Sequence, residues 1–318
     1  MKNMCISNTQ CAGAYWLGAL TRPTITGWAI ALSLLSCPLA THAQFYDFNS
    51  GTDSGWTRYD PLGGLGAGTK GNWVVAGGAY TIQALASPNP SAAGPGRAAS
   101  LRDDVSYADF YISVDLVGWR NDLNQVIGIL SRIRETGLGT TDGYLFSYQT
   151  TAHDIQINRI ANEAGTGIST PVAITLDPAQ DYRLVFSGVG DQMVGRVYAL
   201  TDLITPLATV AASPDSTYPN GVAGLLVYDN SSAGTGTAEA TFDNYLAVEQ
   251  EPRLSVKLAS GNARVSWPVN SNTLSLQRTS SLTPPIVWDN ITTGITTAGG
   301  RNQYDETSGG SKFFRLKP

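Results

Sequence analysis

Two short segments at opposite ends of the main part of the chain combine carboxylates with amides. Asp47 and Asn49 lie in the first (QFYDFNS), and Asp243 and Asn244 lie in the second (AEATFDNYLAVE). Carboxylate, amide and carbonyl oxygens are the ligands that Ca²⁺ takes, about six to eight at a time. If the two segments pair as strands, these four residues are candidate ligands of one structural calcium ion. The alternative is that they bond to the local backbone at a strand junction.

Aromatic rings and planar polar side chains form a second set of candidates, for carbohydrate. Sugars pack their C–H groups on flat rings and bond their hydroxyls to planar polar groups. Arg132 is the most informative candidate, because it follows Val126, Gly128 and Leu130 in phase on an apolar strand, where a charge must be paired or face a cleft. For each ring taken singly, packing in the core or at its rim is the favoured alternative. The candidates are Trp119, Arg120, Arg132, Tyr144, Tyr148, Tyr228 and Asn230.

Catalytic groups are sparse. A retaining glycosidase needs two carboxylates about 5 Å apart, and the best strand, Tyr111–Val117, offers only Asp115. His153 is the one histidine after residue 43, too few for zinc, and no Gly-x-Ser-x-Gly elbow accompanies it. We therefore predict no catalytic residues. A hydrolase or lyase that uses dispersed residues such as Asp115, Arg132 and Tyr148 is the alternative.

The elements that must position these residues read as strands. Asp154–Ile160 alternates apolar residues with Asp154, Gln156 and Asn158, and Gly-rich turns separate many such segments. No helix is expected after the N-terminus. Gln44–Ser50 should pair with Ala238–Glu249, which the Asp243-Asn244 pair should kink or bulge. Residues 44–249 are therefore predicted to form two stacked antiparallel sheets.

A second unit should follow a linker at residues 250–253. Five short strand-like segments lie within residues 254–318, from Leu254–Leu258 to Lys312–Leu316. This size and pattern predict a small β-sandwich of the immunoglobulin or fibronectin type III kind.

The first 43 residues are typical of an export signal. Lys2 and Arg22 are their only Lys, Arg, Asp or Glu residues, and the apolar run Ile25–Ala40 is short for a membrane span. We expect cleavage before Gln44, which gives a secreted or cell-surface protein without a transmembrane segment. Lipidation of Cys37 is the alternative. All three cysteines precede residue 44, so the mature chain would have no disulfide.

Charge is distributed unevenly. Residues 44–251 hold ten Lys or Arg and 22 Asp or Glu, about −12, whereas residues from 252 onward hold eight and three, about +5. The acidic part argues against nucleic acid as a partner. The basic part should bind acidic surfaces in a salt-dependent way and could attach the protein to a cell surface. Two ordinary solvated surfaces would give the same counts.

Several motifs, in this order, resemble one known group of proteins. The chain reads FYDFNSG near the start, then SLRDDVSYADFYISVDLVGW, IGILSRI, GYLFSYQ and LDPAQDYRLVFSGVGDQMVGRVY, and finally ATFDNYLAVE. Residues 44–249 thereby resemble secreted bacterial domains of the concanavalin A-like lectin/glucanase (LamG-like) superfamily. The resemblance implies a jelly roll, glycans bound on the concave sheet or its rim, and often a calcium ion between the first and last strands. The Glu-x-Asp-x-x-Glu motif of its glucanases is absent.

The tail, with VSWP, LSLQRTSSL and FFRLKP, resembles small C-terminal β-domains of secreted bacterial proteins. We therefore predict a secreted, non-catalytic, lectin-like protein that acts at the cell surface or on external polysaccharide. A polysaccharide-active enzyme of the same fold is the first alternative, and a structural or adhesive surface protein is the second.

Overall fold

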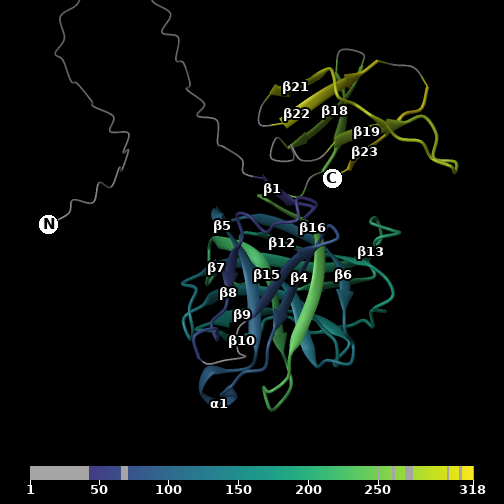
Figure 1. Cartoon of the computed structure of the whole chain (residues 1–318). Coiled ribbons are helices and arrows are strands. Elements are labelled where there is room, and N and C mark those ends of the chain that lie inside the picture. Colours follow the sequence, from purple (N-terminus) through teal and green to yellow (C-terminus); the bar gives the residue numbers. More distant parts are fainter. Residues whose placement is uncertain are drawn as a thin grey trace, which may run out of the picture. The chain divides into compact units, whose positions relative to one another are not determined.

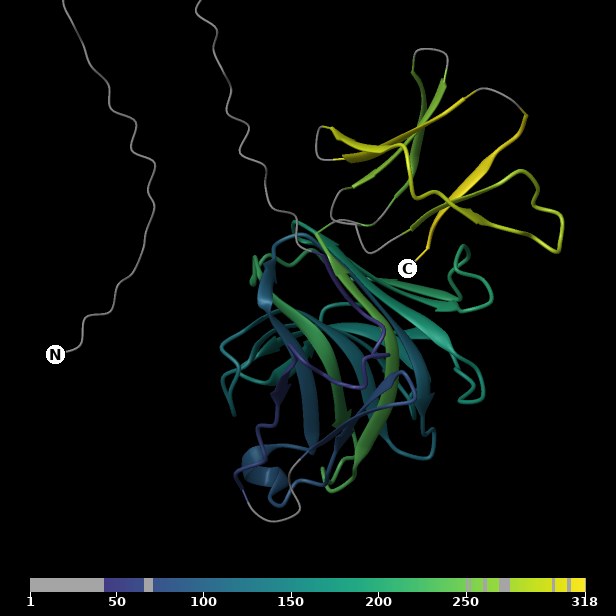
Figure 2. The same ribbon diagram turned by 45° about the horizontal axis from the view of Figure 1, so that its top comes forward.

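The predicted all-β architecture is confirmed. The computed structural model describes residues 43–65, 71–249, 251, 253–259, 262–268, 275–298, 301–307 and 310–317. Residues 43–249 form a sandwich of two antiparallel sheets (Figures 1 and 2). Apart from Ala43, the predicted signal segment lies outside the described residues. No helix in the described ranges is long and apolar enough to cross a membrane.

The first sheet, sheet A, has the strand order β14-β13-β12-β6-β16-β4-β3, with β1 beside β16. In that order the strands are Ala208–Ala211, Gln192–Ala199, Tyr182–Val189, Phe110–Trp119, Ala238–Val248, Ala79–Ala84 and Asn72–Ala76, and β1 is Ala43–Tyr46.

The second sheet, sheet B, has the order β10-β9-β8-β7-β15-β5-β2, and β11 pairs with β9. The chain passes between the sheets at β1–β2, β2–β3, β4–β5, β5–β6, β6–β7, β11–β12, β14–β15 and β15–β16, as in a jelly roll. In sheet order the strands are Ala164–Gly167, Asp154–Ala161, Asp142–Gln149, Gln125–Arg134, Gly221–Asp229, Arg97–Tyr107 and Thr57–Tyr59, and β11 is Val172–Ala173.

The first and last strands of the sandwich pair as predicted. β1 runs antiparallel to β16, with Tyr46 opposite Tyr245. The expected irregularity in β16 is also present: its register against β6 shifts between Asp243 and Leu246, and Asn244 has φ +50°. Asparagine tolerates this left-handed backbone better than most residues. The bulge turns Tyr245 into the core.

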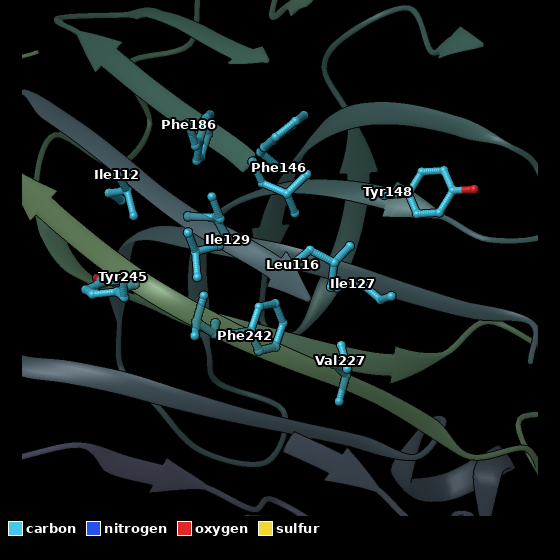
Figure 3. Packing of buried hydrophobic residues seen from close by; sticks show 14 of the residues in the cluster. Ile112, Leu116, Ile127, Ile129, Phe146, Tyr148, Phe186, Val227, Phe242 and Tyr245 are labelled. Atoms are coloured by element: carbon cyan, nitrogen blue, oxygen red, sulfur yellow. The ribbon is translucent and has the colours of Figure 1, made fainter. Parts of the chain in front are cut away.

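The core lies between the two sheets (Figure 3). Ile112 and Leu116 come from sheet A and meet Ile129 and Phe146 from sheet B, because alternate residues of each strand point inward. One expectation was wrong: a one-turn helix, α1, spans Pro90–Ala93. Proline at its start has a fixed φ that suits a first helical turn.

Gly195 shows how tightly the two sheets pack. A Cβ atom added there would lie 2.2 Å from a ring carbon of Phe146. We expect Gly195→Ala to lower the free energy of unfolding by about 1–3 kcal/mol, because the core cannot take the methyl group without moving the ring. Gly64→Ala is the control, since no atom lies within 4 Å of an added Cβ there. Chemical denaturation measures the free energy of unfolding of both variants. An equal loss in Gly195→Ala and Gly64→Ala would contradict tight packing at Gly195.

The C-terminal residues form two small antiparallel sheets with a core of their own. The orders are β17-β18-β22-β21 and β20-β19-β23. Val265 and Trp267 from one sheet pack with Leu276 from the other, so a small sandwich is present. β20 is shorter than the predicted Val287–Asn290. The strands β17 to β23 are Ser255–Ala259, Asn262–Pro268, Ser275–Thr279, Asp289–Asn290, Ile295–Ala298, Arg301–Glu306 and Phe313–Lys317.

Candidate functional site

A polar cluster occupies the outer face of sheet A. Asp115 on β6 is 1% exposed and accepts two hydrogen bonds from Arg183 on β12, at 2.7 and 2.9 Å. Nδ2 of Asn244 donates to Asp115 at 3.0 Å and to Asp243 at 3.1 Å. Both oxygens of Asp115 are therefore engaged by donors. The bulge in β16 builds this cluster, because it turns Asp243 and Asn244 to the same face.

The four predicted calcium ligands do not form a ready-made metal site. Asp47 accepts a bond from the backbone N–H of Asn49 at 3.2 Å, the local pairing that was the alternative. The side-chain amide of Asn244 turns its nitrogen toward the carboxylates of Asp115 and Asp243, whereas calcium takes oxygen ligands. Within the described ranges, no group of three or more His, Cys, Asp or Glu residues could hold a metal ion. Calcium stays a prediction, tested by thermal unfolding with calcium and with a chelator.

Asp243 should destabilise the fold at neutral pH. Its burial raises its pKa, and the nearby carboxylates of Asp115 and Asp47 raise it further. A carboxyl whose pKa is higher in the folded state makes the protein more stable as the pH falls through that value. In calcium-free buffer we expect Asp243→Asn to raise the unfolding midpoint at pH 7 by about 1–2 °C and to lose this advantage near pH 3.

The matched control is Asp47→Asn. Hydrogen bonds from Asn49 lower the pKa of Asp47. The Asp47→Asn variant should therefore show no rise in its unfolding midpoint at pH 7. Thermal scans from pH 3 to 7 check both variants. A rise for Asp47→Asn equal to that of Asp243→Asn would contradict the assignment of repulsion to Asp243.

Three of the seven predicted sugar-binding residues belong to the core. The rings of Trp119, Tyr144 and Tyr148 are all buried between the sheets. The Tyr148 hydroxyl accepts from the backbone N–H of Leu176 at 3.3 Å, and the Tyr144 hydroxyl donates to Asp215 at 2.8 Å. Because no face of these rings is open, they cannot stack on a sugar in this structure.

Arg132 is buried, and its predicted phase is wrong. The pairing of β7 with β8 shifts between Ser131 and Arg134, and Arg132 has φ +49°. This bulge turns its side chain away from the face of Val126. The guanidinium donates to the carbonyls of Ala108, Tyr218 and Gly190, at 2.9, 3.2 and 2.7 Å, and burial lowers its pKa. Arg132 thus connects three loops through hydrogen bonds to their backbone carbonyls.

The remaining three predicted residues lie on the surface or near it. Arg120 is exposed and pairs with Asp122, and Asn230 is exposed and donates to Gln149 at 3.1 Å. The backbone N–H of Asn230 also bonds to the carbonyl of Asn124, in the loop that follows Arg120. Tyr228 is half-buried on the outer face of sheet B. The seven residues therefore do not form one site.

A groove of about 850 Å³ lies on the outer face of sheet B. Typical small-molecule pockets are of about 300–1,000 Å³. Its apolar floor comes from neighbouring strands, which contribute Leu101, Leu130, Leu145 and Leu226. The segment Ala92–Pro95, which includes the end of α1, lines it as well. The groove thus has an apolar floor, and polar side chains line it as well.

Three polar groups of the groove have no hydrogen-bond partner among the described residues. Gln156 and Asn158 are in phase on β9 and line the groove, as does Tyr228 on β15. In the described part of the chain, neither amide side chain nor the Tyr228 hydroxyl makes a hydrogen bond. Asn158 is only 8% exposed. Burial raises the pKa of Tyr228 to about 12, so its hydroxyl keeps its proton at neutral pH.

An ion pair lies among the residues that line the groove. Arg97 on β5 donates to both carboxylate oxygens of Glu163, at 2.9 and 2.7 Å. The Tyr59 hydroxyl and the Gly139 N–H also donate to Glu163. Burial works in the opposite direction, but these bonds hold the pKa of Glu163 below its usual value. Glu163 is the one carboxylate among the groove's described lining residues, and as a paired anion it does not supply an acid–base pair.

The groove thus offers a ligand apolar contact and hydrogen-bonding groups, and the carboxylate among its described lining residues is already paired with Arg97. Sequence reasoning missed Gln156, Asn158, Arg97, Glu163 and Tyr59. The alternation along β9 places Gln156 and Asn158 on its polar face, which is a signal for an outward position. Nothing local indicates that this face lies beside the apolar floor.

No family model and no curated protein matches this chain. Solved structures with a similar arrangement of strands include the carbohydrate-binding module CBM66 from Bacillus subtilis, 18% identical with a TM-score of 0.43, over 61% of this chain and 95% of the module. A lichenase from a mouse hindgut metagenome is 16% identical with a TM-score of 0.48, over 65% and 99%. Basic winged bean lectin is 11% identical with a TM-score of 0.43, over 66% and 100%. Similarities of this size assign no ligand and no residue role.

Proposed function

We propose that this chain is a secreted, non-catalytic carbohydrate-binding protein whose groove on sheet B holds a segment of polysaccharide. One observation carries the proposal: Gln156, Asn158 and Tyr228 present unpaired polar groups beside an apolar floor. Sugars match this pattern, because each ring has apolar C–H faces and hydroxyls at its edge. Because these groups make no hydrogen bond within the described protein, sugar hydroxyls could bond to them in place of water.

Binding is favoured over hydrolysis by the state of the carboxylates. Asp115 is shielded and bonded to Arg183 and Asn244. Glu163 is bonded to Arg97 and Tyr59. A glycosidase needs one carboxyl that can give up a proton and another that can attack or activate water, and neither residue is free to do so here.

The test uses the mature chain, residues 44–318, and a panel of insoluble and immobilised polysaccharides. We expect retention on at least one polysaccharide without release of new reducing ends. Release of oligosaccharides would support the enzyme alternative. Absence of retention on every member, together with self-association, would support the structural or adhesive alternative.

Export is part of the proposal. With residues 1–43 as a signal, the exported protein should begin at Gln44. Amino-terminal sequencing of the protein recovered outside the producing cells checks this expectation. A chain that starts at a lipidated Cys37 would show that the protein is anchored instead.

A further inference from the structure

A hollow of about 630 Å³ on the C-terminal sheet β17-β18-β22-β21 brings several cations together. We call it the basic hollow. Lys257 on β17 lies directly opposite Arg264 on β18, an arrangement of like charges that destabilises a sheet. Arg301 on β22 lines the same hollow. The sheet therefore carries a charge arrangement that a bound anion would relieve.

Among the described residues, two of these cations have no carboxylate partner. Arg264 pairs with Asp305 at 2.7 Å, and Arg253 pairs with Glu251, which also lines the hollow. Within the described residues, Lys257 makes no ion pair. Arg301 instead donates to the hydroxyl and the carbonyl of Ser266, at 3.1 and 2.9 Å. The hollow thus keeps an excess of about two positive charges.

Neutral polar side chains lie between the cations. Ser255, Ser266 and Gln303 line the hollow and occupy paired positions on β17, β18 and β22. Hydroxyl and amide groups suit sugar hydroxyls, whereas Lys and Arg suit carboxylate or sulfate groups. From residue 252 onward the chain has eight Lys or Arg against three Asp or Glu, so a wider positive field would surround such a ligand.

We propose that the basic hollow binds an acidic polysaccharide, in which hydroxyls alternate with carboxylate or sulfate groups. This site is separate in the chain from the groove on sheet B and does not depend on the function proposed for that groove. Nucleic acid fits less well, because the described lining of the hollow includes no aromatic side chain on which a base could stack.

The experiment measures binding of the mature chain to immobilised polygalacturonate, dextran sulfate and neutral dextran, at about 50 and 300 mM salt. We expect binding to one or both acidic polymers, weakening by at least tenfold at the higher salt, and none to dextran. Lys257→Gln/Arg264→Gln should weaken binding about tenfold or more. Lys257 makes no ion pair within the described ranges, so Lys257→Gln alone should weaken binding severalfold without disturbing the fold. It serves as the test if the double variant folds poorly.

The control is Lys312→Gln/Lys317→Gln, which removes the same charge from the same part of the chain outside the hollow. It should bind within about twofold of the parent. An equal loss in this control would show a general charge effect, and full displacement by millimolar inorganic phosphate would show a small-anion site. Equal binding to single-stranded RNA, or no binding at low salt, would also overturn the proposal. Gln156→Ala/Asn158→Ala should leave this binding intact, so failure here is separable from failure of the groove.

Discussion

Asp115→Ala is expected to lower the free energy of unfolding by about 3–5 kcal/mol. The change removes a carboxylate that is 1% exposed and leaves Arg183, which is mostly buried, without its partner. Asn244 also loses an acceptor. An uncompensated buried charge costs far more than a lost surface pair, so this should be among the most damaging single changes outside the apolar core. Chemical denaturation of purified variants measures it.

Asp122→Ala is the matched control. Asp122 also pairs with the guanidinium of an arginine, Arg120, but both side chains are exposed. The control should leave the unfolding midpoint almost unchanged. Replacing both partners, as Asp115→Ala/Arg183→Met, should recover much of the loss, because an apolar pair leaves no buried charge. Equal effects of Asp115→Ala and Asp122→Ala would contradict the account of this cluster as a buried structural ion pair.

Gln156→Ala/Asn158→Ala is expected to weaken polysaccharide binding by about 10–100-fold. Each amide would contribute roughly 0.5–1.5 kcal/mol through its hydrogen bonds, and about 1.4 kcal/mol corresponds to a tenfold change. The free energy of unfolding should stay nearly the same, because neither side-chain amide makes a hydrogen bond to the rest of the described protein. Titration with the retained polysaccharide measures the affinity.

Tyr228→Phe isolates one hydroxyl of the same groove. It keeps the ring that packs beside the apolar floor and should weaken binding by about three- to tenfold. The control is Gln180→Ala/Gln192→Ala, which removes two exposed amides elsewhere. If the control weakened binding as much as the groove variants, the groove would not be the site.

Much of the fold could be predicted from local patterns. Period-two alternation along Asp154–Ile160 identified β9 and its two faces, and the aromatic, carboxylate-bearing ends predicted the pairing of β1 with β16. The bulge at Asn244 was also predictable, because the alternation of β16 changes phase there. The alternation and the bulge depend on residues close together in the sequence, whereas the pairing of β1 with β16 was inferred from the similar composition of two distant segments.

The site was harder to predict, because it depends on which strands become neighbours. Tyr148 looks like a sugar platform in the sequence, but the inner face of β8 faces sheet A, so its ring is buried. A bulge that no local pattern revealed turned Arg132 inward. The groove needs β9 and β15 on the same sheet with β7 and β8 between them, an arrangement set by long-range pairing.

Whether the groove on sheet B binds polysaccharide is tested by side-chain footprinting of the mature chain with a photoreactive carbene probe, with and without the retained polysaccharide. Bound polysaccharide should reduce labelling at Gln156, Tyr228 and their neighbours on sheet B. Labelling on the outer face of sheet A, around Thr241 and Asp243, should stay constant. Protection around Asp243 with no change at Gln156 would contradict the proposed groove and place the binding site on the opposite sheet.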